Sequence, residues 1–121
     1  MAAAANLNFP KSRRLVRPAE FERVRQEGRA ERGKLLIIGV LAVPDLNRVR
    51  AGFVTSKRLG GAVVRNRVRR RLRAVVRKHQ HGLCNGLWVV TIARPPAARV
   101  SSRALEDEWL RLAKRASILA D

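Results

Sequence analysis

The sequence predicts a small α+β domain, a central sheet with helices packed on it. Three observations carry this prediction: the chain length, the apolar content, and the alternation of helical and strand patterns. The chain has 121 residues and is 46% hydrophobic, which suits one domain with its own core. We expect the order α-β-β-α-β-α over residues 18–121, preceded by a flexible basic arm over residues 1–17.

The N-terminal half of this domain is expected to hold one helix and two strands. Pro18 suits the first turn of a helix that runs to Glu27, and Gly28 is a plausible stop. The apolar runs Leu35–Val43 and Val49–Ser56 each predict a strand. A turn cluster of Pro, Asp and Asn separates these strands, and so short a connection favours an antiparallel pair.

The C-terminal half is expected to hold a long helix, a third strand and a last helix. The long helix spans Ala62–His79, the strand spans Leu87–Ala93, and Ser101 or Ser102 caps the last helix. Apolar residues follow the helical period in both helices. The two stripes are Val64, Val68, Leu72, Val75 and Val76 in the first helix, and Leu105, Trp109, Leu112 and Ala116 in the second.

The charge pattern is the strongest indication of function. Lys and Arg total 27 against 9 acids, a formal charge of +18, and such a surplus attracts polyanions. No acid lies between Asp45 and Glu106, while cations concentrate between Lys57 and Lys78. Solvated helix faces usually mix signs because like charges one turn apart repel, so this nearly pure cationic face favours phosphate contact. The cationic side of the long helix carries Asn66, Arg69, Arg70, Arg73 and Arg77, and Arg65, Arg67 and Arg71 flank the apolar stripe.

The residue types needed for catalysis or metal binding are sparse. His79 and His81 could bind zinc with Cys84, but solvated residues at a helix end are the simpler interpretation. A single cysteine allows no internal disulfide and fits a reducing, cytoplasmic compartment. No apolar run approaches the roughly 20 residues needed to cross a membrane. We therefore expect no catalytic residue and no metal site on the protein, and no membrane association.

One stretch resembles a known family. From Thr55 to Arg70 the chain reads T-S-K-R-L-G-G-A-V-V-R-N-R-V-R-R. This closely resembles the signature of the bacterial ribonuclease P protein family, in which a strand ending in S-K leads through a glycine turn into a helix with R-N-R. The motif Arg13-Arg14-Leu15 before Phe21, and Ala93-Arg94-Pro95 after the third strand, resemble further family patterns. The resemblance covers about residues 11 to 116.

The resemblance implies a fold, a function and a set of partners. The implied fold is ribosomal-protein-S5-domain-2-like, with a left-handed βαβ crossover against the usual rule. The implied assembly is a cytoplasmic ribonucleoprotein that removes the 5′ leader of precursor tRNA. Its RNA subunit performs the hydrolysis with Mg²⁺, and the protein binds both that ribonuclease P RNA and the leader. No obligate protein partner is evident.

The resemblance also implies the binding residues. Phe21, Arg25 and Lys57 would contact the leader, in a cleft between the first helix and the sheet, although Phe21 could equally be a core residue. Arg25 stands where the family often has a second aromatic residue, and Gly61 stands where it commonly has Asn. The residues implied to bind RNA are Lys57, Arg58, Arg65, Asn66, Arg67, Arg69, Arg70 and Arg73.

Two other classes of protein remain open on the residues alone. A ribosomal protein would use the same basic helix as a purely structural RNA contact. A DNA-binding protein would place that helix in a major groove, although groove-reading helices usually mix Asn, Gln and Ser among their cations. The nearly pure arginine face of this helix favours contacts with phosphates.

Overall fold

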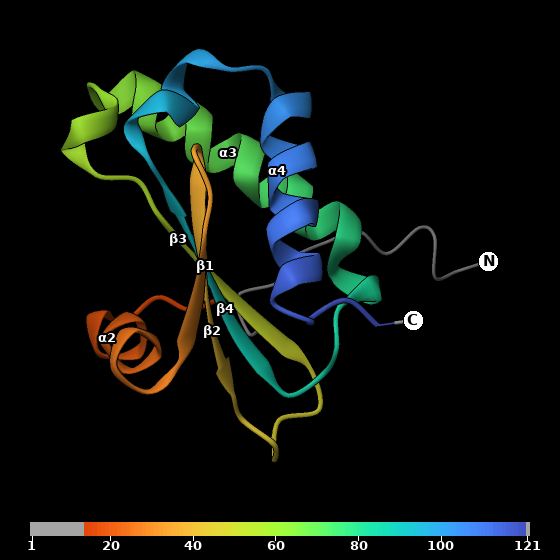
Figure 1. Ribbon diagram of the computed structural model, residues 1–121. Coiled ribbons are helices and arrows are strands. Elements are labelled where there is room, and N and C mark those ends of the chain that lie inside the picture. The colour runs from red at the N-terminus through yellow and green to blue at the C-terminus, as the bar shows by residue number, and fades with distance from the viewer. Residues whose placement is uncertain (1–13, 121) are drawn as a thin grey trace.

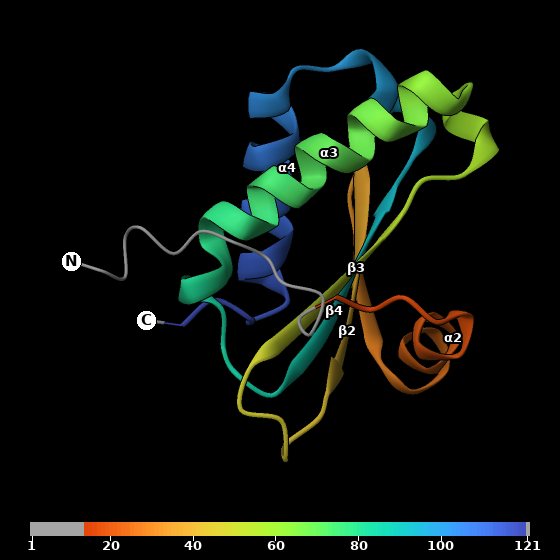
Figure 2. The same cartoon turned by 180° about the vertical axis from the view of Figure 1, so that it is seen from behind.

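A strongly twisted sheet divides the molecule into two layers of helices (Figure 1). The computed structural model describes residues 14–120. Seen from either side, α2 lies against one face of the sheet, and α3 and α4 lie against the other (Figure 2). The helices are α2 (Pro18–Glu27), α3 (Ala62–His79) and α4 (Ser102–Arg115); the strands are β1 (Arg29–Arg32), β2 (Leu36–Ala42), β3 (Val49–Val54) and β4 (Leu87–Ala93); short 3-10 turns are η2 (Lys57–Leu59), η3 (Gln80–Gly82) and η4 (Pro95–Arg99).

The predicted fold class is confirmed, with one strand more than expected. The three helices and three longer strands lie where the sequence places them, to within two residues at the strand ends. The additional strand is β1, which reads R-A-E-R and is mostly exposed. It lies at the edge of the sheet. Because no apolar alternation marks it, its sequence gives no strand signal.

The neighbours of the strands correct one expectation. The sheet order is β1-β2-β4-β3, so the pair β2 and β3, expected to be adjacent, is separated by β4. β4 pairs antiparallel with β2 and parallel with β3. The segment β3-α3-β4 is therefore a parallel crossover unit, in which α3 connects the two strands. The sequence of β4 suits its central position because it is apolar except for Thr91, as is typical of interior strands.

Each face of the sheet has its own apolar cluster. On one face the stripes of α3 and α4 pack against alternate residues of β2 and β4, around a fully buried Trp109. The Trp109 ring nitrogen donates a hydrogen bond to the Thr91 hydroxyl over 3.1 Å, which satisfies both buried polar groups. On the other face, a smaller cluster lies beneath α2. It consists of Leu15, Val24, Leu41 and Val90.

The helix α4 is fixed at its start and at its middle. The Ser101 hydroxyl accepts a hydrogen bond from the Ala104 N–H over 3.1 Å, so this serine is an N-cap. One turn further on, the buried carboxylate of Glu108 accepts hydrogen bonds from the backbone N–H groups of Leu35 and Leu36, at 2.6 and 2.7 Å. This carboxylate joins α4 to the turn between β1 and β2.

The expected basic arm falls largely outside the described residues, which begin at Arg14. Residues 14–17 lie beside β3, where the Leu15 N–H donates a hydrogen bond to the Ala51 carbonyl over 2.8 Å. Leu15 is buried in the cluster beneath α2. Within residues 14–120, every helix is too short or too polar to cross a bilayer.

Candidate nucleic-acid interface

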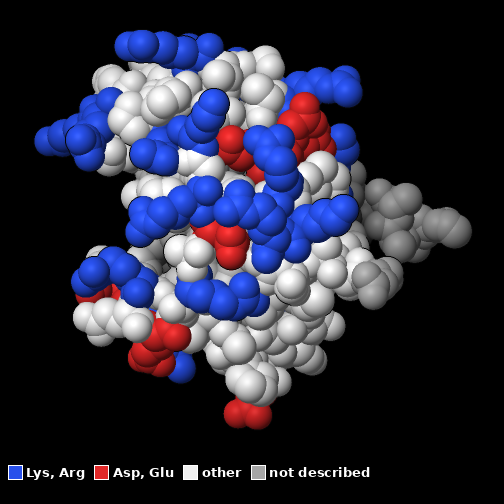
Figure 3. All heavy atoms as spheres, in the orientation of Figure 1, with Lys and Arg blue, Asp and Glu red and all other residues white. Residues whose placement is uncertain are grey.

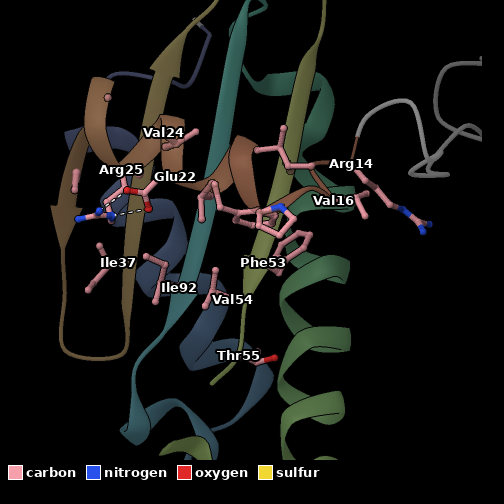
Figure 4. Close-up of a pocket in the computed structure, with 18 of the residues that line it drawn as sticks. Arg14, Val16, Glu22, Val24, Arg25, Ile37, Phe53, Val54, Thr55 and Ile92 are labelled. Carbon is pink, nitrogen blue, oxygen red and sulfur yellow. Dashed lines mark hydrogen bonds and ion pairs between the residues drawn. The ribbon is translucent and has the colours of Figure 1, made fainter. Parts of the chain in front are cut away.

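A cleft of about 1090 Å³ is bounded by α2, the sheet and α3. Three half-buried aliphatic side chains, Ile37, Ile92 and Val54, form its floor (Figure 4). They lie in one row across neighbouring strands, because Ile92 of β4 pairs with Ile37 on one side and with Val54 on the other. Among residues 14–120, no helix covers this apolar floor.

Phe21 of α2 lies at the wall of this cleft. It is half-buried, lines the cleft and also packs against the small cluster beneath α2. Its ring lies over Gly52, where an added Cβ would come within 2.6 Å of the ring. A larger residue at this position of β3 would therefore displace the ring. From the sequence, Phe21 could either line the cleft or belong to the core, and the structure places part of its ring in each.

The second expected leader residue, Arg25, lines the same wall. Its guanidinium donates two hydrogen bonds to Glu22, one of them over 3.0 Å (Figure 4). The hydrogen bond from Arg25 is the main cause that lowers the pKa of Glu22. Both side chains are exposed, and such ion pairs contribute little stability. A competing phosphate can therefore displace Glu22 from Arg25.

The opposite wall of the cleft carries Arg69 and Arg73 of α3, with Arg14 beside them. Arg69 donates to the Thr55 hydroxyl over 2.5 Å and to the side-chain oxygen of Asn66 over 3.3 Å, and both acceptors are neutral. Burial lowers the pKa of Arg73, and the positive charges of Arg14, Arg69 and a third arginine lower it further. An arginine stays charged despite such a shift. This wall is consequently a site of mutual repulsion that an anion would relieve.

Other implied RNA-binding residues of α3 lie outside the cleft. Arg67 donates to the Ala98 carbonyl over 3.1 Å and so helps to join α3 to η4. The Nε atoms of Arg65 and Arg67 are buried and find no hydrogen-bond partner among residues 14–120. Arg70 is exposed and lines a groove between α3 and α4. The arginine-rich face is thus partly used for packing, with its remaining donors directed to the surface.

Lys57 and Arg58 do not line the cleft but come shortly after one of its lining residues in the sequence. Both are exposed in η2, two and three residues after the cleft residue Thr55. Sequence reasoning missed other lining residues, including two charged ones on β1, because that strand was not expected. The missed charged residues of the cleft are Arg14, Glu22, Arg29 and Arg32. Arg14 had a signal, since it belongs to the basic stretch before α2.

Two side chains that could carry chemistry, His79 and Ser101, are engaged in structural roles. The His79 ring lies 2.7 Å from a Glu106 oxygen and stacks on Trp109 at a centroid distance of 6.2 Å. Ser101 is a helix cap. Within residues 14–120, His, Cys, Asp and Glu nowhere gather in a group of three or more that could hold a metal ion. The described site offers cations, an apolar floor and an aromatic ring, which are binding groups.

Comparison with known proteins gives a consistent result. The family model of ribonuclease P matches residues 9–117. The ribonuclease P protein component of Roseiflexus castenholzii is 42% identical over 108 residues, covering 88% of this chain and 87% of that protein. The Chloroflexus aurantiacus component is 43% identical over 107 residues, covering 88% and 78%.

Solved structures agree on the fold. The Staphylococcus aureus ribonuclease P protein has a TM-score of 0.84 at 24% identity, covering 90% of this chain and 99% of that one. The Thermotoga maritima protein has a TM-score of 0.77, also at 24% identity, covering 84% and 96%. The family match includes the R-N-R helix and the whole sheet. The chain therefore belongs to the ribonuclease P protein family, and its role is that of the protein subunit of the ribonucleoprotein that matures the 5′ ends of tRNA.

Proposed function

We propose that the protein binds the 5′ leader of precursor tRNA in the cleft and binds ribonuclease P RNA through the exposed side of α3. The RNA subunit carries out the hydrolysis with Mg²⁺, in the cytoplasm. The observation that carries the proposal is the cleft itself, an uncovered apolar floor between two walls of arginine. An unpaired RNA strand has both of the matching surfaces, with bases for the floor and phosphates for the walls.

The two walls differ in how they would hold a strand. On the α3 wall, Arg69 and Arg73 face other cations, so a phosphate there removes repulsion as well as adding an ion pair. On the α2 wall, Phe21 offers a ring on which a base can stack. Arg25 donates hydrogen bonds to Glu22 in the free protein, and a phosphate would have to replace this carboxylate. The α3 wall therefore supplies most of the electrostatic attraction, and the α2 wall supplies the stacking.

The remaining cations of α3 suit a large folded RNA. Arg70 and Arg77 are exposed, and Asn66 adds an exposed amide beside them. Contacts of this kind neutralise phosphates and release counterions, which makes binding strong and salt-sensitive. Because Arg69 and Arg73 are on the same helix as this surface, α3 would lie between the two RNAs and contact both.

The place proposed for Mg²⁺ follows from the donors that the protein offers. Mg²⁺ prefers carboxylate oxygens and water, and the described residues provide no group of acids that could hold it. The RNA subunit would hold the ion. The contribution of the protein is its own positive charge, which reduces the repulsion between two RNA chains and so lowers the Mg²⁺ concentration that the assembly needs.

The proposal is tested by binding of precursor tRNA with and without its leader, in the presence of ribonuclease P RNA. We expect the double variant Arg69→Gln/Arg73→Gln to lose about 10- to 100-fold in affinity for the leader-bearing substrate, with a smaller loss for the leaderless one. The control variant Arg48→Gln/Lys114→Gln removes the same charge at two exposed positions outside the cleft. Equal losses for both substrates, or for both variants, would contradict the proposed leader site.

A further inference from the structure

A second basic pocket lies between the β1–β2 turn and α4, around the edge of the sheet from the cleft. Its volume is about 540 Å³. Figure 3 shows basic side chains gathered in a band across the face that β1 and α4 share. In the described part of the chain, Arg32 and Lys34 of this pocket have no ion-pair partner. The cations that line the pocket are Arg32, Lys34, Arg94, Arg111 and Arg115.

The pocket is held in shape by a buried carboxylate. One oxygen of Glu108 accepts the two backbone N–H groups that follow Lys34, and the other oxygen accepts from Arg111 over 3.2 Å. The β1–β2 turn packs tightly against this carboxylate, since an added Cβ at Gly33 would lie 2.5 Å from a Glu108 oxygen. Arg94 donates to the Gly33 carbonyl over 2.7 Å. Glu108 is thus occupied on both oxygens, and its hydrogen bonds set the positions of the cations around it.

The charge of the pocket favours a polyanion. Its five cations face two carboxylates, Glu108 and the Glu31 that pairs with Arg115 over 3.1 Å, which leaves a net charge of +3. The cations come from β1, the β1–β2 turn, the end of β4 and two successive turns of α4. Charges spread along a surface in this way suit the repeated phosphates of a nucleic-acid strand better than one compact anion.

Arg32 connects this pocket to the cleft, because it lines both. It lies on β1, the edge strand, which no further strand covers. We infer that an RNA strand bound in the cleft continues over the β1 edge, and that the second pocket holds its next phosphates. This inference rests on the proposed function in one respect, that the cleft binds unpaired RNA. It adds a second, length-dependent contact that the cleft does not provide.

The experiment measures the affinity of the protein for unstructured oligouridylates of about 4 to 16 nucleotides, a range typical of single-strand sites. The test variant is Lys34→Gln/Arg111→Gln, which changes the second pocket and leaves the cleft intact. The control is Arg103→Gln/Lys114→Gln, which removes the same charge from exposed positions of α4 outside the pocket. Melting curves confirm that each variant is folded.

We expect wild-type affinity to rise with length, and the test variant to bind the longest RNA about tenfold more weakly than the control does. At the shortest length the two variants should be equal. The slope of log affinity against log salt for the longest RNA should fall by about 1.4, since each lost phosphate contact removes about 0.7. Equal affinities of test and control at every length would overturn the inference, as would an equal loss at all lengths. Failure of the wild type to bind even the longest RNA would instead refute the proposed cleft.

Discussion

Replacing Phe21 by Ala separates the two roles that the structure gives this ring. The ring is half-buried on Gly52 and lines the cleft, so the change removes part of a packing contact and one stacking surface. A fully buried Phe→Ala change costs about 3–5 kcal/mol, and we expect about 1–2 kcal/mol of lost stability here because only part of the ring is buried. That corresponds to a fall in Tm of roughly 4–8 °C. Loss of stacking on one base should weaken leader-dependent binding by about 1–3 kcal/mol, roughly 5- to 150-fold.

The assay compares leader-bearing and leaderless precursor tRNA, in complex with ribonuclease P RNA, below the melting temperature of each variant. Leu41→Ala is the matched control, because Leu41 is buried in the same cluster beneath α2 but does not line the cleft. The control should lose stability and keep the difference between the two substrates. A large fall in Tm for Phe21→Ala with an unchanged leader effect would show that the ring is only a packing residue.

Three further predictions concern charged groups. Replacing Arg65 and Arg67 by Ala should weaken binding of ribonuclease P RNA by about 1–3 kcal/mol in total and leave the protein folded, because the apolar stripe of α3 is unchanged; a salt titration showing wild-type affinity would mean that this face is not a binding surface. Replacing Glu22 by Gln should release Arg25 and strengthen leader binding, most clearly at low salt; an unchanged or weaker affinity at low salt would count against a phosphate contact at Arg25. Hydrogen bonds from a histidine and a lysine of α3 lower the pKa of Glu106 below 4.5, so this group stabilises the fold above that pH and stops doing so as the pH falls through its folded pKa. Wild type should therefore melt higher than Glu106→Gln at pH 7, and a difference that does not shrink at all as the pH falls through the acidic range would refute this assignment.

The elements of the fold were predictable where periodicity was strong. The apolar stripe of α3, with Val68 and Leu72 fully buried, followed directly from the helical repeat. β1 was not predictable, because an edge strand that reads R-A-E-R has no buried face to mark it. The order of the strands was not predictable either. A short connection indicates that β2 and β3 run in opposite directions, but β4 lies between them because it pairs with both.

The candidate site was predictable as a set of residue types and less so as a geometry. Cationic residues on α3 were expected together, but the helical period alone does not show that Arg69 and Arg73 turn into the cleft while Arg67 donates to the η4 backbone. Glu108 is the last of three successive acids in the first half of α4. Its burial against the β1–β2 turn depends on a contact between residues 72 positions apart, which no local pattern contains.

The family match favours the ribonuclease P interpretation over a ribosomal or a DNA-binding protein, the two alternatives that the residues alone left open. Its most direct consequence concerns the division of labour between protein and RNA. The described residues offer binding groups and no metal-binding cluster. If the RNA subunit carries out the hydrolysis as proposed, purified protein free of RNA should leave precursor tRNA intact in the presence of Mg²⁺.

The measurement that tests this division of labour is cleavage of precursor tRNA at low Mg²⁺ by ribonuclease P RNA alone, by the protein alone, and by both together. We predict that the RNA alone is nearly inactive at that Mg²⁺ concentration, that the protein alone is inactive, and that the mixture cuts at the mature 5′ end. Cleavage by the RNA-free protein, or failure of the folded protein to restore cleavage by the RNA, would contradict the account.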